Sequence, residues 1–160
     1  MTIIETKRTI ARQLRQSQAQ IGLSAALNNL SFKLAGRELS GHPHTIWEQV
    51  EHMRLAAEDL LDYCTNPDYV AKKWPAGYWS KNSSPDSTET WENGKAGLLA
   101  ATERMAQIIE DPDTDLYGML PAADRDHHHT LRAALILLDH NSYHIGQLIA
   151  LRKALGVWQS

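Results

Sequence analysis

Residues 130–156, TLRAALILLDHNSYHIGQLIALRKALG, form the longest uninterrupted helical pattern in the sequence. It begins with Thr130, whose hydroxyl is typical of a helix N-cap, and it ends with Gly156, which can adopt the left-handed conformation beyond a helix C-terminus. Apolar residues and two histidines recur in it at alternating steps of three and four residues: Leu137, His140, His144, Leu148, Leu151 and Leu155. This period places them on one face of an α-helix. The stretch therefore predicts one long helix with two histidines on its apolar stripe.

The histidine pair, His140 and His144, has a cost if the stripe is buried. A buried imidazole needs partners for both ring nitrogens, and an unpaired nitrogen costs about 1–3 kcal/mol. Two histidines at i and i+4 can direct one nitrogen each at a single metal ion, as in the H-E-x-x-H zinc helix, although the glutamate of that motif is missing here. The alternative is two core histidines satisfied by hydrogen bonds. Spacing alone leaves both interpretations open.

Composition is that of an ordinary globular protein. The chain has 160 residues, of which 42% are hydrophobic and 22% charged, with a formal net charge of −3. No basic block indicates nucleic-acid binding, and no apolar run approaches membrane-spanning length. The first residues lack the apolar core of a signal peptide, so a cytoplasmic location is expected. Cys64 is the only cysteine, which excludes an intramolecular disulfide, and its place on a helical stripe predicts a small buried hydrophobe.

Three further stretches have the periodicity of amphipathic helices: residues 3–34, 45–65 and 86–110. None of the remaining sequence is convincing as a strand. The fold class is therefore all-α, a four-helix bundle in a single domain spanning residues 1–160. Long connections of about twenty residues join the second helix to the third and the third to the fourth. Such connections can cross the bundle, so a simple up-down-up-down order is not implied.

Two helix starts carry residue pairs with the spacing of a capping box, Thr45 with Glu48 and Asp86 with Glu89. The helix that starts at Thr45 contains His52. At 100° per residue, His52 lies about 120° from the centre of the apolar stripe. Periodicity alone therefore predicts a surface or boundary histidine.

The first long connection, residues 66–85, is rich in aromatic residues: Tyr69, Trp74, Tyr78 and Trp79. These side chains cannot all be solvated without cost, so the loop is expected to pack on the helices. It could cover a binding site, or it could be a hydrophobic plug at one end of the core.

Two other features have functional interpretations. The run His127, His128 and His129 is a rival metal-binding feature, but adjacent side chains point in different directions, which favours a solvated tract. The last helix also has a second apolar edge, formed by Leu131, Leu138, Ile145 and Ile149. A helix that is apolar on two sides is usually buried on two sides, so a homodimer through this helix is expected.

Several of these segments together resemble the DinB-like (DinB/YfiT) superfamily, four-helix bundles found in bacteria. The resemblance covers nearly the whole chain and is carried by IWEQVEHM at residues 46–53, WPAGYW at 74–79, Trp91 and LLDHNSYHIGQLIALRKALG at 137–156. The last segment is the most specific, with its two histidines followed by Gly-Gln and by Leu-Arg-x-x-x-Gly.

The resemblance implies that His52 joins His140 and His144 to bind one divalent metal ion. Glu48, one turn before His52, would then be either an acceptor for a ring N–H or a structural cap only. The metal would be zinc, nickel or iron, all of which suit imidazole. Relatives of this kind use a low-molecular-weight thiol, so the resemblance implies an S-transferase-like or isomerase-like enzyme in which a metal-activated thiol or water attacks a small electrophile. The alternative is a stress-response protein that binds a metal or a small ligand without turnover.

Overall fold

The computed structural model describes residues 2–124 and 127–158, and in this part of the chain the regular secondary structure is helical. The elements are α1 (Ile3–Arg15), α2 (Leu23–Leu27), α3 (Phe32–Ala35), α4 (Ile46–Thr65), the 3-10 helix η1 (Ala76–Tyr78), α5 (Thr88–Glu110) and α6 (Thr130–Ala154). The predicted all-α class is confirmed.

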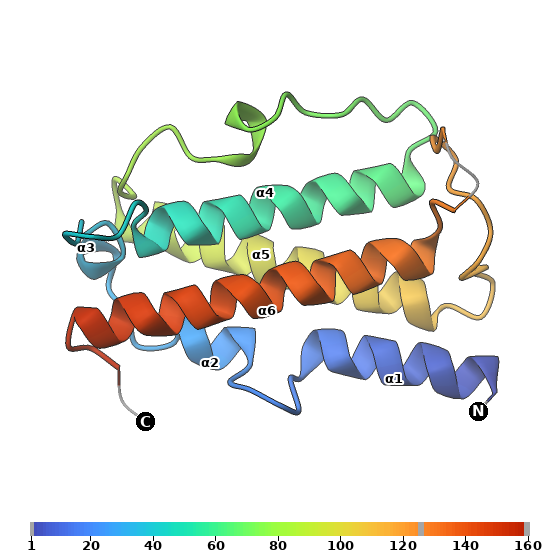
Figure 1. Cartoon of the computed structure of the whole chain (residues 1–160), viewed down its shortest axis with the longest axis horizontal. Helices are drawn as coiled ribbons and strands as arrows, with labels where there is room; N and C mark the ends of the chain where they lie inside the picture. Colours follow the sequence, from blue (N-terminus) through green and yellow to red (C-terminus); the bar gives the residue numbers. More distant parts are fainter. Residues whose placement is uncertain (1, 125–126, 159–160) are drawn as a thin grey trace.

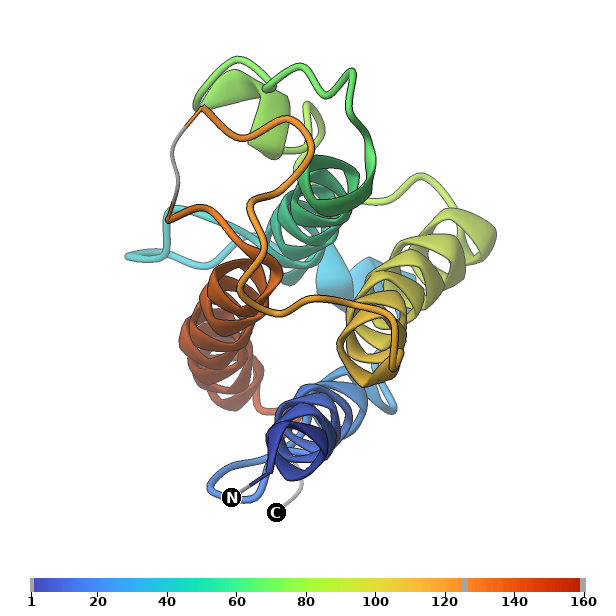
Figure 2. The same ribbon diagram turned by 90° about the vertical axis from the view of Figure 1, so that its right-hand side faces the viewer.

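The longest helices, α1, α4, α5 and α6, lie side by side around a common core. Figure 2 shows them end-on, at four corners. Helices α4 and α5 run in one direction, and α1 and α6 run in the other (Figure 1). Because α4 and α5 are parallel, residues 66–87 must return along the outside of α4 to reach the start of α5. The order of the helices is thus not up-down-up-down, and the long aromatic connection is the crossover that this order requires.

The single helix predicted before residue 35 is wrong, because the chain there forms three short helices with breaks between them. Asn29 has a positive φ of 55°, a conformation that ends a helix. Tertiary donors also bind carbonyl groups of this segment. Arg152 Nη1 donates to Ala26 O over 2.6 Å, and Trp91 Nε1 donates to Leu30 O over 2.8 Å. These bonds from α6 and α5 satisfy backbone groups that a continuous helix would have paired internally.

The core contains most of the apolar residues of the stripes predicted for α4 and α5, together with residues from the other elements and loops. Fully buried members from α4 and α5 are Val50, Met53, Ala57, Trp91, Leu98, Met105 and Ile109. Cys64 is buried as well, and burial raises the pKa of its thiol to about 11. A thiol in this state is mostly protonated at neutral pH, which fits the predicted hydrophobic role.

The predicted start of α4 is confirmed, and that of α5 is shifted. Thr45 and Glu48 form the complete capping box: Glu48 N donates to Thr45 Oγ1, and Thr45 N donates to Glu48 Oε2. At α5 the N-cap is Ser87, whose Oγ accepts from Thr90 N, so the assignment to Asp86 was wrong by one residue. Asp86 instead accepts a hydrogen bond from the Thr90 hydroxyl.

The N-cap of α6 is also one residue from its predicted position. His129 Nδ1 accepts from Arg132 N over 3.1 Å, while Thr130 is buried inside the first turn. An unprotonated imidazole nitrogen thus replaces the expected hydroxyl as acceptor. At the other end, Gly156 has a φ of 72° and follows the last turn, as the sequence predicts.

The second apolar edge of α6 packs within the chain. Ile145 is 5% exposed and belongs to the core, and Leu131, Leu138 and Ile149 pack partly buried against it. The exposed apolar side chains of α6 lie elsewhere on the helix, at Leu135, Ile136 and Tyr143. The homodimer stays a prediction, and Ile145 belongs to the monomer core.

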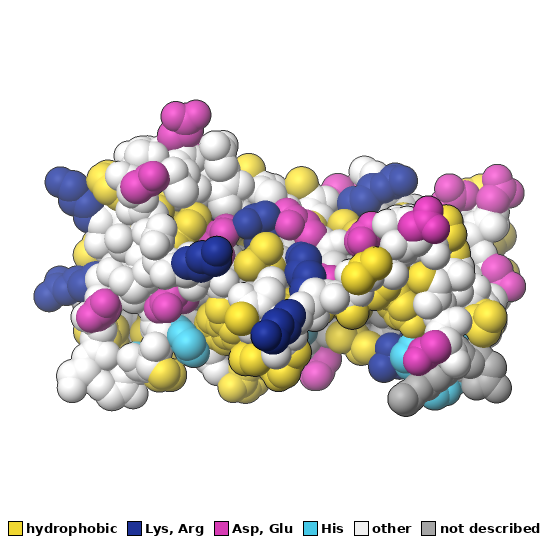
Figure 3. All heavy atoms as spheres, turned by 90° about the horizontal axis from the view of Figure 1, so that it is seen from above, with side chains coloured by type: hydrophobic (Ala, Val, Ile, Leu, Met, Phe, Trp, Pro, Cys, Tyr) yellow, Lys and Arg dark blue, Asp and Glu magenta, His cyan; other side chains and the backbone are white. Residues whose placement is uncertain are grey.

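Figure 3 looks onto the side of the molecule that carries the crossover loop. Over the described residues of this side, hydrophobic side chains are interspersed with acidic and basic ones. No helix in the described part of the chain is long and apolar enough to cross a membrane.

Candidate metal centre

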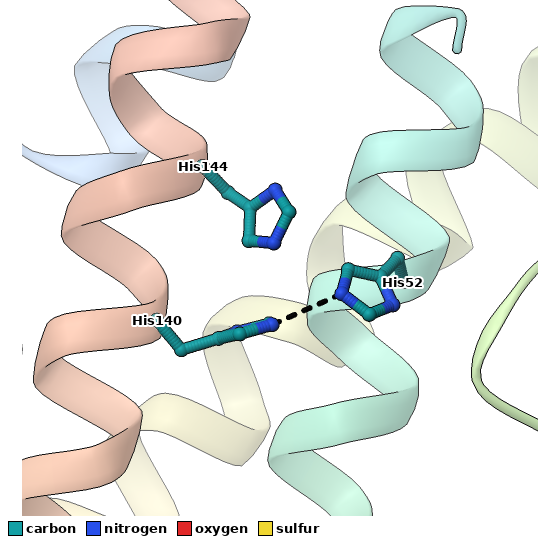
Figure 4. A group of neighbouring side chains, drawn as sticks. All are labelled: His52, His140 and His144. Atoms are coloured by element: carbon teal, nitrogen blue, oxygen red, sulfur yellow. Dashed lines mark hydrogen bonds between the residues drawn. The ribbon is translucent and has the colours of Figure 1, made fainter. Parts of the chain in front are cut away.

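Three histidines from two helices converge between α4 and α6. Figure 4 shows His52 on α4 pointing toward His140 and His144 on α6. Nε2 of His52 lies 3.0 Å from Nε2 of His140, and one nitrogen from each ring lies within 4.8 Å of the other two. The structure thus brings together the three residues that the resemblance implied.

His52 is 5% exposed, which differs from the surface or boundary position that periodicity predicted. The flank of α4 that carries it is covered by the crossover loop. The indole of Trp79 stacks on the imidazole at a centroid distance of 4.1 Å and an angle of 6°. Nδ1 of His52 lies 2.8 Å from the carbonyl oxygen of Tyr78. Since a carbonyl can only accept, Nδ1 carries the proton and the lone pair of Nε2 faces the cluster.

Tyr78 is itself held on α4. Its hydroxyl donates to Oδ2 of Asp59 over 2.8 Å, and Tyr69 donates to the same oxygen over 3.1 Å. Asp59 lies about two turns beyond His52 on the same helix. Asp59 therefore holds the crossover loop against α4, and the Tyr78 carbonyl of this loop determines that the proton of His52 is on Nδ1.

His144 is fixed by a side chain rather than by the backbone. Its Nδ1 lies 2.5 Å from Oε1 of Gln49, and both residues are 5% exposed. With the amide oxygen as acceptor, Nδ1 of His144 carries the proton and Nε2 is left with its lone pair. Figure 4 shows that nitrogen turned toward the other two rings. Gln49 was not recognised in the sequence; its signal was a polar residue among the buried positions at the start of α4.

His140 is the least constrained of the three. It is partly buried, and its Nδ1 is buried without a hydrogen-bond partner among the described residues. Its Nε2 faces Nε2 of His52. Since the proton of His52 is on Nδ1, a direct hydrogen bond between the two rings requires His140 to donate. A cation between them would instead use both lone pairs.

The cluster favours neutral imidazole. Burial, together with the smaller effect of the neighbouring histidines, lowers the pKa of His144 to about 3 and that of His140 to about 4; burial also lowers the pKa of His52. Neutral imidazole is the form that ligates metals. All three rings are therefore in their ligating form at neutral pH.

The donor set fits a divalent cation. Three nitrogens at about 2.0–2.1 Å from a tetrahedral zinc ion lie about 3.3 Å apart, comparable with the spacing of this cluster. Two of the three rings have the outer nitrogen bound to an oxygen acceptor, as ligating histidines commonly do. Three protein ligands also leave a coordination position for water or another small ligand.

The other candidate residues lie outside the cluster. The carboxylate of Glu48 accepts from the Thr45 backbone, and its other oxygen lies 3.9 Å from Nδ1 of His44. It is therefore the structural cap, and the carbonyl of Tyr78 binds the ring N–H of His52 in its place. In the histidine run, His129 caps α6 and His128 lies 2.6 Å from the Tyr63 hydroxyl, so the predicted solvated tract is in part structural.

A cavity of about 570 Å³ lies against the cluster. Its lining includes His52 and His144, together with Trp74, Trp79, Tyr143 and His44. Trp79 is enclosed between two imidazoles, since His44 stacks on it at 3.9 Å and His52 at 4.1 Å. The cavity is within the size range of small-molecule sites and gives the cluster access to a ligand.

No family model, no curated protein and no solved structure matches this chain. The resemblance to the DinB-like superfamily therefore stays a prediction.

Proposed function

We propose that this chain is a DinB-like four-helix-bundle metalloprotein in which His52, His140 and His144 bind one divalent cation. The observation that supports this most directly is the orientation of the rings. The carbonyl of Tyr78 and the amide of Gln49 bind the outer nitrogens of His52 and His144, so that both inner nitrogens present lone pairs to one point. Zinc, nickel and iron all suit such a site.

The proposed activity is that of a metal-dependent enzyme acting on a small electrophile, with an S-transferase-like or isomerase-like reaction. A divalent cation at three imidazoles supplies Lewis acidity and lowers the pKa of a coordinated water or thiol. The residues of the chain hold the cation, exclude bulk water from one side of it and shape the adjoining cavity. The nucleophile would come from a low-molecular-weight thiol or from water, because Cys64 is buried and protonated.

The second candidate is a non-catalytic protein that binds a metal or a small ligand. Among the described residues that line the cavity none is a carboxylate or a lysine, so in the enzyme a general acid or base would have to be His42, His44 or Tyr143, and in the binder no such role is needed. Turnover of an electrophile that stops when the metal is chelated supports the enzyme; stoichiometric binding without product supports the binder.

Metal content tests the proposal. Protein purified without a polyhistidine tag should contain about one divalent ion per chain, and alanine at His52, His140 or His144 should remove most of it, since losing one of three ligands leaves a weak site. His42→Ala is the matched control, because His42 also lines the cavity but lies outside the cluster. A His52 variant that keeps its metal, or a wild-type protein that binds none, refutes the assignment.

The proposed assembly is a homodimer through α6. Since Ile145 is in the core, the informative substitution is at Leu135, which is exposed and lies outside the cavity lining. Sedimentation of the wild-type chain as a monomer at micromolar concentration contradicts the dimer.

A further inference from the structure

The lining of the cavity beside the histidines contains no permanently charged side chain among the described residues. Its residues are histidines, aromatic and aliphatic residues and two glutamines, and none of these described lining residues is Lys, Arg, Asp or Glu. Thus the cavity offers no fixed countercharge to the part of a ligand that it encloses.

This lining disfavours a ligand with an anionic body, where the body is the part of the ligand other than the atom directed at the histidines. A carboxylate or phosphate that leaves water needs a cationic or multiply hydrogen-bonding partner, and without one the transfer costs several kcal/mol. The only positive charge that the proposed function provides is the divalent ion itself, and this ion can pair with a single donor atom. A second anionic group further along the ligand would meet no lysine or arginine, only uncharged donors such as the Gln147 amide and the Tyr143 hydroxyl.

A cationic ligand body is disfavoured for a different reason. Aromatic walls can bind ammonium groups through cation–π contacts, but no carboxylate lines this cavity. The divalent ion at its base would repel a second cation. Neither sign of charge suits the body of the ligand.

Two aromatic side chains border the cavity with their surfaces exposed. Trp74 is 71% exposed and Tyr143 is 64% exposed, although both line the cavity. They come from different elements: Trp74 from the crossover loop and Tyr143 from α6, one residue before His144. Trp79, by contrast, has both faces covered by imidazoles and can offer only an edge. A flat ligand that covers Trp74 and Tyr143 would remove apolar surface from water.

We propose that the cavity binds a small molecule with an uncharged aromatic body and one donor atom directed at the three histidines. The proposal rests on the metal site proposed above and names the class of ligand for it. The body lies against Trp74 and Tyr143, while the donor atom reaches the space between His52 and His144.

Three thiols test the proposal on protein loaded with cobalt(II), whose absorption spectrum reports a coordinated thiolate. They are benzyl mercaptan, 4-(mercaptomethyl)benzoate and cyclohexylmethanethiol, which share the thiol and differ in charge or aromaticity. Benzyl mercaptan should bind at least about tenfold more tightly than the benzoate, because the carboxylate of the benzoate would be buried without a charged partner. It should also bind roughly 2- to 10-fold more tightly than the cyclohexyl compound, because aromatic pairing is lost there.

Matched variants connect these preferences to the cavity. Ala150 is exposed and lines the cavity, so Ala150→Lys should bring the affinity for the benzoate close to that for benzyl mercaptan. Ala100→Lys adds the same charge at an exposed position of α5 outside the cavity lining and should leave the preference unchanged. Trp74→Ala should weaken benzyl mercaptan, whereas Val70→Ala, in the same loop and 82% exposed, should not.

The results separate this proposal from the one on which it rests. A protein that takes up no cobalt refutes the metal site, and the ligand proposal falls with it. Two results on the cobalt-loaded protein would support the metal site but refute the proposal of an uncharged aromatic ligand. The first is equal affinity for the benzoate and for benzyl mercaptan. The second is no binding of either compound by cobalt absorption or by tryptophan fluorescence.

Discussion

The hydrogen bond from Gln49 to His144 gives the sharpest prediction, since it tests the orientation of the cluster without removing a ligand. Gln49→Leu keeps much of the volume of the side chain, although it is one atom shorter, and removes the oxygen that lies 2.5 Å from Nδ1 of His144. Both residues are 5% exposed, so water has little access to replace that oxygen. The ring N–H of His144 would be left buried without an acceptor.

The expected size of the effect follows from this burial. An unpaired buried donor costs about 1–3 kcal/mol of the free energy of unfolding of the metal-free protein. Loss of a hydrogen bond to the outer nitrogen of a ligating histidine typically costs 10- to 100-fold in metal affinity, or about 1.4–2.7 kcal/mol. Gln49→Glu keeps an acceptor and adds negative charge, so it should bind metal at least as tightly as the wild type.

Two measurements separate these effects. Competition between the protein and a chromophoric chelator gives the zinc affinity, and urea unfolding in excess chelator gives the stability of the metal-free protein. Gln107→Leu is the control, because Gln107 is exposed on α5 and its hydrogen bonds are on the surface. If Gln49→Leu binds zinc within twofold of the wild type while His144→Ala does not, Gln49 does not position the ring and the tautomer argument for His144 is refuted.

Two further predictions concern stability. Lys7 is 7% exposed, and its ammonium donates to the carbonyls of residues 111, 112 and 114 at 2.7, 3.2 and 2.7 Å. Lys7→Met should therefore lower the free energy of unfolding by about 2–4 kcal/mol, whereas Arg8→Met, at an exposed position, should change it little. Equal urea midpoints for these two variants would contradict the bridge between α1 and the end of α5. The metal-free protein should also lose stability as pH falls below 6.5. The unfolded chain then protonates its histidines, whereas in the folded chain the pKa is about 3 for His144 and about 4 for His140. Each of these histidines lowers the free energy of unfolding by up to about 1.4 kcal/mol per pH unit until its folded pKa is reached. Urea unfolding in chelator at pH 7.5 and 5 measures this loss, which should be smaller in His144→Gln; an equal loss in the two proteins would show that His144 is not held neutral.

The sequence by itself determined the helices that carry most of the core. The spacing of apolar residues in α4, α5 and α6 identified most of the buried apolar residues of these helices, and it placed His140 and His144 on one face. These features depend on the 3.6-residue period and on chain-breaking residues near the helix ends, which are local properties. The capping box of Thr45 and Glu48 is equally local, and it too was read correctly.

Where the sequence reading failed, the deciding contacts come from other elements. The segment before residue 35 has helical periodicity, yet donors from Trp91 and Arg152 take its carbonyls and the helix breaks. At the starts of α5 and α6 the N-caps are Ser87 and His129, each one residue from the predicted position, because neighbouring polar side chains compete for the same backbone N–H groups.

The site itself was decided by the tertiary structure. Periodicity puts His52 on a flank of α4, and only the crossover loop makes that flank interior, by stacking Trp79 on the ring and placing the carbonyl of Tyr78 against Nδ1. The loop takes this path because α4 and α5 are parallel and the chain must return along α4 between them (Figure 1). The spacing of apolar residues shows which side of a helix is apolar. The partner of a polar group on that helix depends instead on which other segment packs against it. For that reason the sequence could indicate two histidines of the cluster from their spacing, while the burial of the third and the direction of all three lone pairs depend on contacts between α4, α6 and the loop.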